Sequence, residues 1–356
     1  MCSHRIAVAR FEQPNQALDW FGAMQAQDYP QARWAVGVRC INASDTTVEQ
    51  AIADKTMLRT WAMRGTLQLL APQNVRWLLE LVGPRLIARG AGDDLRRFGL
   101  DEAEFTKIEG IFYKILRGTQ LTRKETFAAL EEHGIATEGQ RGYHVLNRAG
   151  LRGQICFGVW RGKEETFTLL EEWLPPTKPM PRDQALAELA LRYFRSHGPA
   201  TLQDYVWWSS LTVAEARQGL EAIRSGLIEE RVGNTTYWLA ANTPMTKLPS
   251  PSVYLLAGFD EYLLGYTDRS AILSTVQNTK AILSNGIFKP TVVVDGQIVG
   301  IWARKVHKGK LTVTHELSAP LSTRAQKALL EAAETYGHFL NIQRTQITVD
   351  ASKQPV

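Results

Sequence analysis

This sequence has few cysteines and no long apolar runs. These two features argue against a disulfide-stabilised protein, a cysteine-ligated zinc protein and a membrane-spanning protein. The three cysteines, Cys2, Cys40 and Cys156, are scattered and odd in number, so they suggest neither a disulfide framework nor the ligand spacing of a zinc site. No uninterrupted apolar run approaches the roughly 18–20 residues that cross a bilayer. The N-terminus also lacks the apolar core of a signal peptide. We therefore expect a cytoplasmic protein that does not associate with membranes.

Cofactor motifs are missing as well. The sequence contains no HxE…CxxC or HExxH zinc motif, no P-loop and no dinucleotide fingerprint. We therefore expect no metal ion, no nucleotide and no other cofactor.

What the chain does have is length, an ordinary apolar fraction and a positive charge. Its 356 residues, 44% hydrophobic and 22% charged, are typical of a soluble globular protein, and this length allows about two or three domains. A net charge of +5 and a pI of 9.0 mildly favour a polyanionic partner.

One pattern of elements occurs three times along the chain. Two or three short helical segments are followed by a strand, a tight basic or glycine turn, and another strand. This is the outline of a winged helix-turn-helix, in which the hairpin is the wing. The clearest copy has an amphipathic helix over 183–197, a capping box that opens a helix at 212, and strands over 227–232 and 235–239.

The other two copies carry arginine-glycine turns at equivalent places. The first has helices over 14–24, 30–39 and 47–54, then strands over 57–61 and 66–70 around Arg64-Gly65. The second has a capping box at 122–125, a helix over 140–151, and strands over 155–160 and 166–170 around Arg161-Gly162. Between positions 141 and 163 this copy has basic residues and no acidic one, namely Arg141, Arg148, Arg152, Arg161 and Lys163. This pattern favours phosphate contacts, and a solvated helix face is the alternative interpretation.

The pattern changes to strands after a second linker at 243–251. Strands are predicted over 253–256, 291–294, 298–305, 310–316 and 345–350, with a helix over 322–340. The fold class is therefore α+β, with three tandem winged helix-turn-helix units and a small β-barrel-like C-terminal domain. The predicted boundaries are 1–101, 102–178, 179–245 and 246–356.

The stretch from Met24 to Pro30 places two amides and a carboxylate within four residues. Gln25 and Gln27 would diverge on a helix, because residues two apart do not face each other there. Pro30 disfavours the helical conformation of the preceding residue, so an extended chain, on which the amides converge, is favoured. One interpretation is a paired-amide site at a helix end, with Asp28 beside it. The other, which this stretch taken alone favours, is two ordinary polar residues in a helix–helix connection.

Two other clusters are candidates to support a site. Asp260 and Glu261 are adjacent carboxylates, which form either an acid pair near the substrate or, as the favoured interpretation, a network that holds Arg269. A basic hairpin tip, which could grip phosphate or simply lie on the surface, contains Lys305, His307 and Lys308. Four tryptophans are interpreted as core or domain-contact residues: Trp61, Trp207, Trp208 and Trp302.

These stretches together resemble the AlkZ/YcaQ family of winged-helix DNA glycosylases. The similarity is carried by Met24-Gln25-Ala26-Gln27-Asp28-Tyr29-Pro30, by 59–67, by 197–209, by 258–269 and by 285–290. The resemblance implies three winged-helix units in a concave arrangement, a C-terminal β domain, and excision of alkylated purines, with unhooking of interstrand crosslinks in some members. Gln25 and Gln27 match its Gln–aliphatic–Gln catalytic motif. Another branch carries an aspartate at the position of Gln27, from which Asp28 is displaced by one residue.

The resemblance also gives the chemistry a coherent form. An N7-alkylpurine is cationic and already a good leaving group, so the site must mainly stabilise an oxocarbenium-like sugar and hold a water. Two amide dipoles could serve both purposes. Arg33, Arg59 and Arg64 are expected at the rim, on flanking phosphates, since a fully positive pocket would oppose a cationic lesion.

The sequence thus predicts a monofunctional DNA glycosylase that acts on damaged double-stranded DNA and is associated with the nucleoid. A non-catalytic winged-helix DNA-binding or regulatory protein is the alternative. An RNA-binding or assembly module has little support, because no exposed stacking motif is evident.

Overall fold

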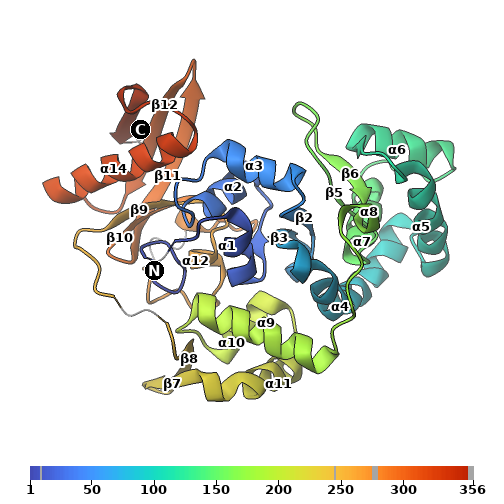
Figure 1. Cartoon of the computed structure of the whole chain (residues 1–356), viewed down its shortest axis with the longest axis horizontal. Coiled ribbons are helices and arrows are strands. Elements are labelled where there is room, and N and C mark those ends of the chain that lie inside the picture. Colours follow the sequence, from blue (N-terminus) through green and yellow to red (C-terminus); the bar gives the residue numbers. More distant parts are fainter. Residues whose placement is uncertain (9, 244–245, 275–279, 352–356) are drawn as a thin grey trace.

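The computed structural model describes residues 1–8, 10–243, 246–274 and 280–351 (Figure 1). The first unit lies in the middle of the molecule, and the other parts surround it in Figure 1. Its elements are α1 (Pro14–Phe21), β1 (Met24–Gln25), α2 (Tyr29–Gly37), α3 (Asp45–Ala53), β2 (Leu58–Trp61) and β3 (Leu67–Leu70).

The start of the chain departs from the prediction at one helix end. A helix was expected to reach residue 24, but α1 ends at Phe21 because Gly22 adopts a left-handed conformation with φ of 83°. The chain then becomes extended, and β1 pairs antiparallel with β3. The glutamine stretch therefore begins in a strand.

The second unit continues the sheet of the first. It contains α5 (Glu102–Leu116), β4 (Leu121–Thr122), α6 (Arg123–Glu132), α7 (Arg141–Leu151), β5 (Ile155–Phe157), β6 (Thr166–Leu169) and α8 (Leu170–Trp173). Strand β2 pairs with β5 through Arg59 and Phe157, which gives one six-stranded sheet in the order β1-β3-β2-β5-β6-β4. A 27-residue helix, α4 (Pro72–Phe98), connects the two units.

The third unit has the predicted order of elements. It consists of α9 (Arg182–His197), α10 (Leu202–Ser209), α11 (Val213–Ile223) and the hairpin of β7 (Leu227–Val232) and β8 (Thr235–Ala240). The Thr201 and Thr212 side chains cap α10 and α11. The predicted boundary at 245 and 246 touches residues 244–245, which lie outside the described residues.

The C-terminal part is an open sheet covered by one helix. Its strands are β9 (Val253–Leu256), β10 (Thr291–Val294), β11 (Gln297–His307), β12 (Lys310–Leu317) and β13 (Ile347–Ala351). Their order is β13-β12-β11-β10-β9, and within the described ranges no strand joins the two edges. The expected barrel-like closure is therefore not seen, because α14 (Thr323–Phe339) occupies one face and brings β13 alongside β12 in parallel.

Buried aromatic side chains join this sheet to the first unit. Tyr336 of α14 packs edge-on against Trp34 of α2 and against Trp302 of β11, with ring centroids 4.8 and 5.0 Å apart. One continuous hydrophobic core runs through all four parts. Within the described ranges, no helix combines the length and apolar character that crossing a bilayer requires.

Candidate active site

Gln25 lies in β1, and the chain bends at Gln27 and Asp28 before α2 begins at Tyr29. The Gln25 Oε1 lies 3.4 Å from the Thr66 hydroxyl, and the Gln27 Oε1 accepts from the Leu67 backbone amide at 3.4 Å. The two glutamines are therefore not helical, and their side chains reach adjacent residues at the start of β3.

The two glutamines differ in burial. Gln25 is only 6% exposed, whereas Gln27 is exposed. Asp28 is also exposed, and its carboxylate caps α2 by accepting from the Gln31 amide at 3.2 Å. The carboxylate of Asp28 thus caps the N-terminus of α2, while the side chain of Gln27 is accessible to solvent.

Arg64 holds the buried glutamine. Its guanidinium donates to Gln25 Oε1 at 2.8 Å and to the Trp208 carbonyl at 2.7 Å, and its backbone amide donates to the Ser210 hydroxyl at 3.0 Å. Arg64 itself has φ of 59°, in the left-handed region. Burial lowers the pKa of Arg64, and the nearby Glu261 carboxylate opposes that shift.

Glu261 anchors the same glutamine from behind. This side chain is 1% exposed, and its Oε1 accepts a hydrogen bond from the backbone amide of Gln25 at 3.1 Å. Its Oε2 accepts from the Trp208 indole at 2.9 Å and lies 3.3 Å from His197 Nε2. Burial alone would raise the pKa of Glu261, but the His197 and Trp208 hydrogen bonds and the Arg64 charge outweigh burial and lower it. Glu261 is therefore ionised, and burial keeps His197 neutral by lowering its pKa.

The neighbouring carboxylate forms a different buried pair. Asp260 receives two hydrogen bonds from Arg39, at 2.7 and 2.8 Å, and both side chains are fully buried. The interpretation that this carboxylate pair holds Arg269 is wrong. The Arg269 guanidinium donates instead to the carbonyls of Leu263 and Thr267, because the chain turns back on itself after α12 (Glu261–Leu264).

Most of the predicted phosphate-binding arginines carry a carboxylate partner. The pairs are Arg33 with Asp45 and Glu49, Arg59 with Glu165, Arg141 with Glu104, Arg148 with Glu102, Arg152 with Glu102 and Glu109, and Arg161 with Glu125. No acidic residue lies between positions 141 and 163 in the sequence, but α5 and α6 bring carboxylates alongside in space. Arg59 and Arg148 are also buried.

The remaining predicted basic residues are exposed. Lys163 lies in the turn between β5 and β6. Lys305 and His307 lie at the end of β11, and Lys308 lies in the turn that follows it. None of these four side chains forms an ion pair within the ranges that the structure describes. They are free to meet an external anion without first leaving a carboxylate.

Sequence reasoning did not name His197, Trp208 and Arg39 as residues of the site. His197 and Trp208 lie in the stretch that carries the family resemblance, and Trp208 was interpreted only as a core or contact residue. It is fully buried, as are Trp61 and Trp302, whereas Trp207 is 40% exposed. Only the three-dimensional contacts with Glu261 reveal the connection of His197 and Trp208 to Gln25, and Arg39 contacts Asp260 instead.

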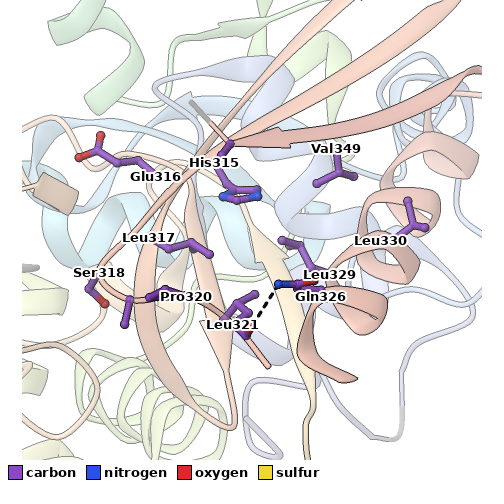
Figure 2. A pocket seen from close by; sticks show the side chains of 12 residues that line it. His315, Glu316, Leu317, Ser318, Pro320, Leu321, Gln326, Leu329, Leu330 and Val349 are labelled. Atoms are coloured by element: carbon purple, nitrogen blue, oxygen red, sulfur yellow. Dashed lines mark hydrogen bonds between the residues drawn. The ribbon is translucent and has the colours of Figure 1, made fainter. Parts of the chain in front are cut away.

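A separate cavity of about 700 Å³ lies between β12, β13 and α14 (Figure 2). His315 and Leu329 project toward it, and Gln326 donates to the Leu321 carbonyl at 3.1 Å at its edge. None of its lining residues belongs to the Gln25 network. In the described part of the chain, no cluster of three or more His, Cys, Asp or Glu side chains is arranged to hold a metal ion.

Comparison with known proteins matches residues 18–339 to the family described as DNA glycosylase AlkZ-like. The chain belongs to this AlkZ-like family. The expected family, DNA glycosylase class and DNA substrate are thus confirmed. The interstrand DNA cross-link repair glycosylase of Streptomyces sahachiroi is 29% identical over 305 residues, covering 78% of this chain and 79% of that protein.

The fold is confirmed by a solved structure. That of Streptomyces sahachiroi DNA glycosylase AlkZ matches with a TM-score of 0.78 and 24% identity, and covers 98% of this AlkZ-like chain and 96% of the solved one. The mixture of helices and strands predicted from the sequence is therefore the family fold.

Proposed function

We propose that this DNA glycosylase is monofunctional and hydrolyses the N-glycosidic bond of alkylated, cationic purines in duplex DNA, with Gln25 and Gln27 as catalytic residues. The observation that supports the proposal is that the carbonyl oxygens of both amides reach adjacent residues at the start of β3, Thr66 and Leu67. Amides are polar without being charged, so they orient water and stabilise a cationic sugar without competing for a proton.

The charge balance around these amides suits a cationic lesion. Arg64 donates to Gln25, but the ionised Glu261 lies behind the same residue and offsets the guanidinium charge. The site therefore avoids the fully positive pocket that would repel an N7-alkylpurine. Arg64 is integrated into the site and does not sit at its rim.

We propose that the exposed basic residues contact the DNA backbone from the concave face of four units, with the boundaries predicted above. Lys163, Lys305, His307 and Lys308 need no rearrangement to meet a phosphate. The paired arginines Arg33, Arg59, Arg141, Arg148, Arg152 and Arg161 would have to exchange a carboxylate for a phosphate. Such binding would place the protein at the nucleoid of the cytoplasm.

The test is release of 7-methylguanine from duplex DNA by the Gln25→Ala, Gln27→Ala double variant. We expect the single-turnover rate to fall by about 10²–10³-fold, the loss associated with removing oriented dipoles from an active site. The control is Gln50→Ala, Gln343→Ala, which truncates two exposed glutamines outside the site. Undiminished release by the Gln25 and Gln27 variant would refute the assignment.

A second substrate extends the same experiment. The name of the Streptomyces relative, an interstrand DNA cross-link repair glycosylase, supports an interstrand crosslink as an additional substrate. A crosslink through N7-alkylated purines would carry the same cationic leaving group. We expect wild-type protein to convert such a duplex to single strands on a denaturing gel, and the double variant to leave it crosslinked. Conversion of the monoadduct alone would confine the substrate to single lesions.

A further inference from the structure

The orientation of the Gln25 amide follows from the chemistry of its partner. A guanidinium has hydrogen-bond donors and no acceptor, so the Gln25 atom 2.8 Å from Arg64 must be the carbonyl oxygen. The amino group then points away from Arg64. Within the described part of the chain, Gln25 Nε2 makes no hydrogen bond, and it is not among the polar atoms sealed from solvent. Its two N–H groups are available to a substrate.

Other contacts hold Arg64 in the position from which it donates to Gln25. Its left-handed backbone is held by the Ser210 hydroxyl, and the other arm of its guanidinium is held by the Trp208 carbonyl. Trp208 is in turn fixed through its indole by Glu261. The same carboxylate accepts the backbone amide of Gln25, so Gln25 is fastened at both ends of the residue.

Gln27 has no comparable restraint. It is exposed, and its carbonyl has a single contact at 3.4 Å, to the Leu67 amide. A contact of this length is weak. Its amide can therefore rotate and present its oxygen to a water or to the sugar. The paired amides are chemically alike but mechanically different.

We infer that Gln25 acts as a fixed hydrogen-bond donor and Gln27 as an adjustable acceptor, with Arg64 and Glu261 as positioning residues for Gln25. This division rests on the proposed function. As the C1′–N9 bond of a cationic purine breaks, its electron pair passes to N9 and the base leaves neutral. Electron density on the purine nitrogens rises, and a fixed N–H donor stabilises it. Water bonds to C1′ and its proton passes to solvent, while the Gln27 carbonyl faces the water and the positive sugar.

Carboxylate variants separate donor from acceptor. Glutamate has the shape of glutamine, but its ionised form only accepts. We expect Gln25→Glu to lower the single-turnover rate of base release by about 10²-fold, the cost of one oriented donor. We expect Gln27→Glu to lower the same rate by a factor at least about tenfold smaller than Gln25→Glu does, because the glutamate side chain keeps the acceptor. A Gln25→Glu rate within about threefold of wild type would overturn the donor assignment.

The role of Arg64 is tested by separating chemistry from DNA affinity. We expect Arg64→Met to reduce the single-turnover rate at saturating protein by about tenfold or more, with an unchanged Kd for lesion-containing duplex. Arg64→Lys should recover part of the rate, because an ammonium still donates to Gln25 Oε1. The matched control is Arg96→Met, an exposed arginine paired only with Asp93. A raised Kd with a full rate at saturation would make Arg64 a phosphate contact and overturn the positioning role.

Thermal unfolding of each variant shows that the protein remains folded, and Arg64→Lys provides the rate if Arg64→Met does not fold. The proposed function and the donor role of Gln25 are contradicted by different results. If the Gln25→Ala, Gln27→Ala variant releases base normally, the proposed function and this inference both fall. If that variant is inactive while Gln25→Glu is active, only the donor assignment falls.

Discussion

The two arginine-glycine turns of this molecule occupy equivalent places in the first two units but have opposite surroundings. Arg64 is enclosed by residues of the third unit and the C-terminal part, and contacts Gln25, Trp208 and Ser210. Arg161 is exposed and pairs with Glu125 and the Gln120 carbonyl of its own unit. The same dipeptide is therefore half-buried and holds Gln25 in one copy, and it remains a surface turn in the other.

The difference lies in the neighbours and not in the hairpins. Both hairpins belong to one sheet, joined through β2 and β5. Only the first turn is met by α10 and the residue after it, which supply a carbonyl and a hydroxyl to Arg64. Glu261, which opens α12, adds a nearby negative charge. A repeated unit thus supplies the shape of the turn, and the later parts of the chain decide its role.

Removing the carboxylate behind each turn should give the largest contrast. Glu261→Leu leaves three buried donors without an acceptor, on Gln25, Trp208 and His197. Each unsatisfied buried donor costs about 1–3 kcal/mol, so we expect the free energy of unfolding to fall by about 3 kcal/mol or more. Urea unfolding followed by tryptophan fluorescence measures this loss.

The matched change at the surface turn is Glu125→Leu. Glu125 is the exposed partner of Arg161 and belongs to the capping box of α6, so its loss should lower the free energy of unfolding much less than the loss of Glu261 does. Equal destabilisation by the two variants would show that Glu261 is not the buried anchor described here.

Much of the fold could be predicted because local signals agreed with the tertiary structure. The helix predicted over 183–197 is α9, and the strands predicted over 253–256 and 291–294 have these bounds in the structure. Two features escaped. Helix α4 contains Pro84 and several glycines, which weaken the helical pattern, and packing of its buried residues overrides that local preference. The pairing of β2 with β5 joins strands of different units, and no local sequence pattern predicts such a pairing.

The site was predictable to a smaller extent. Gln25 and Gln27 could be selected because the motif resembles a family. The effect expected of Pro30 on the preceding residue is not seen, since α2 begins at Tyr29. The partners of the arginines could not, since Glu102 and Glu109 lie some forty residues before the arginines they neutralise. Arg64 was expected on DNA phosphates, and only the position of Trp208 and Gln25 in space shows what its guanidinium contacts.

Two buried histidines, His4 and His197, should also make the free energy of unfolding depend on pH in mild acid. Burial holds the pKa of His4 well below 6.5 and also lowers the pKa of His197. Below pH 6.5 these two histidines therefore bind protons in the unfolded chain but not in the folded chain. The free energy of unfolding falls as the pH falls. We expect a loss of about 1.4 kcal/mol per pH unit for each histidine between pH 6.5 and the lowered pKa.

The lowered pKa of Glu261 acts in the same direction at lower pH. Its stabilisation is present above the unfolded pKa of 4.5 and is lost as the pH falls through the folded pKa. Urea unfolding at pH 7.5, 6.5 and 5.5 isolates the histidine contribution, and His4→Asn should reduce the slope. His307→Asn, on the exposed hairpin, controls for loss of a histidine as such. Stability that does not change over this range would contradict the neutral, buried state of His4 and His197.

The smallest expected effect concerns DNA binding by the exposed turn. If Arg161 exchanges Glu125 for a phosphate, Arg161→Met should weaken binding to damaged and undamaged duplex alike, because a backbone contact carries no sequence information. The slope of log K against log salt should fall in magnitude by about one, the release of one counterion. Fluorescence anisotropy between low and moderate salt measures the slope. Arg64→Met should leave it unchanged, since that guanidinium is committed to Gln25 and Trp208. A reduced slope for Arg64→Met together with an unaltered slope for Arg161→Met would reverse the roles of the two turns.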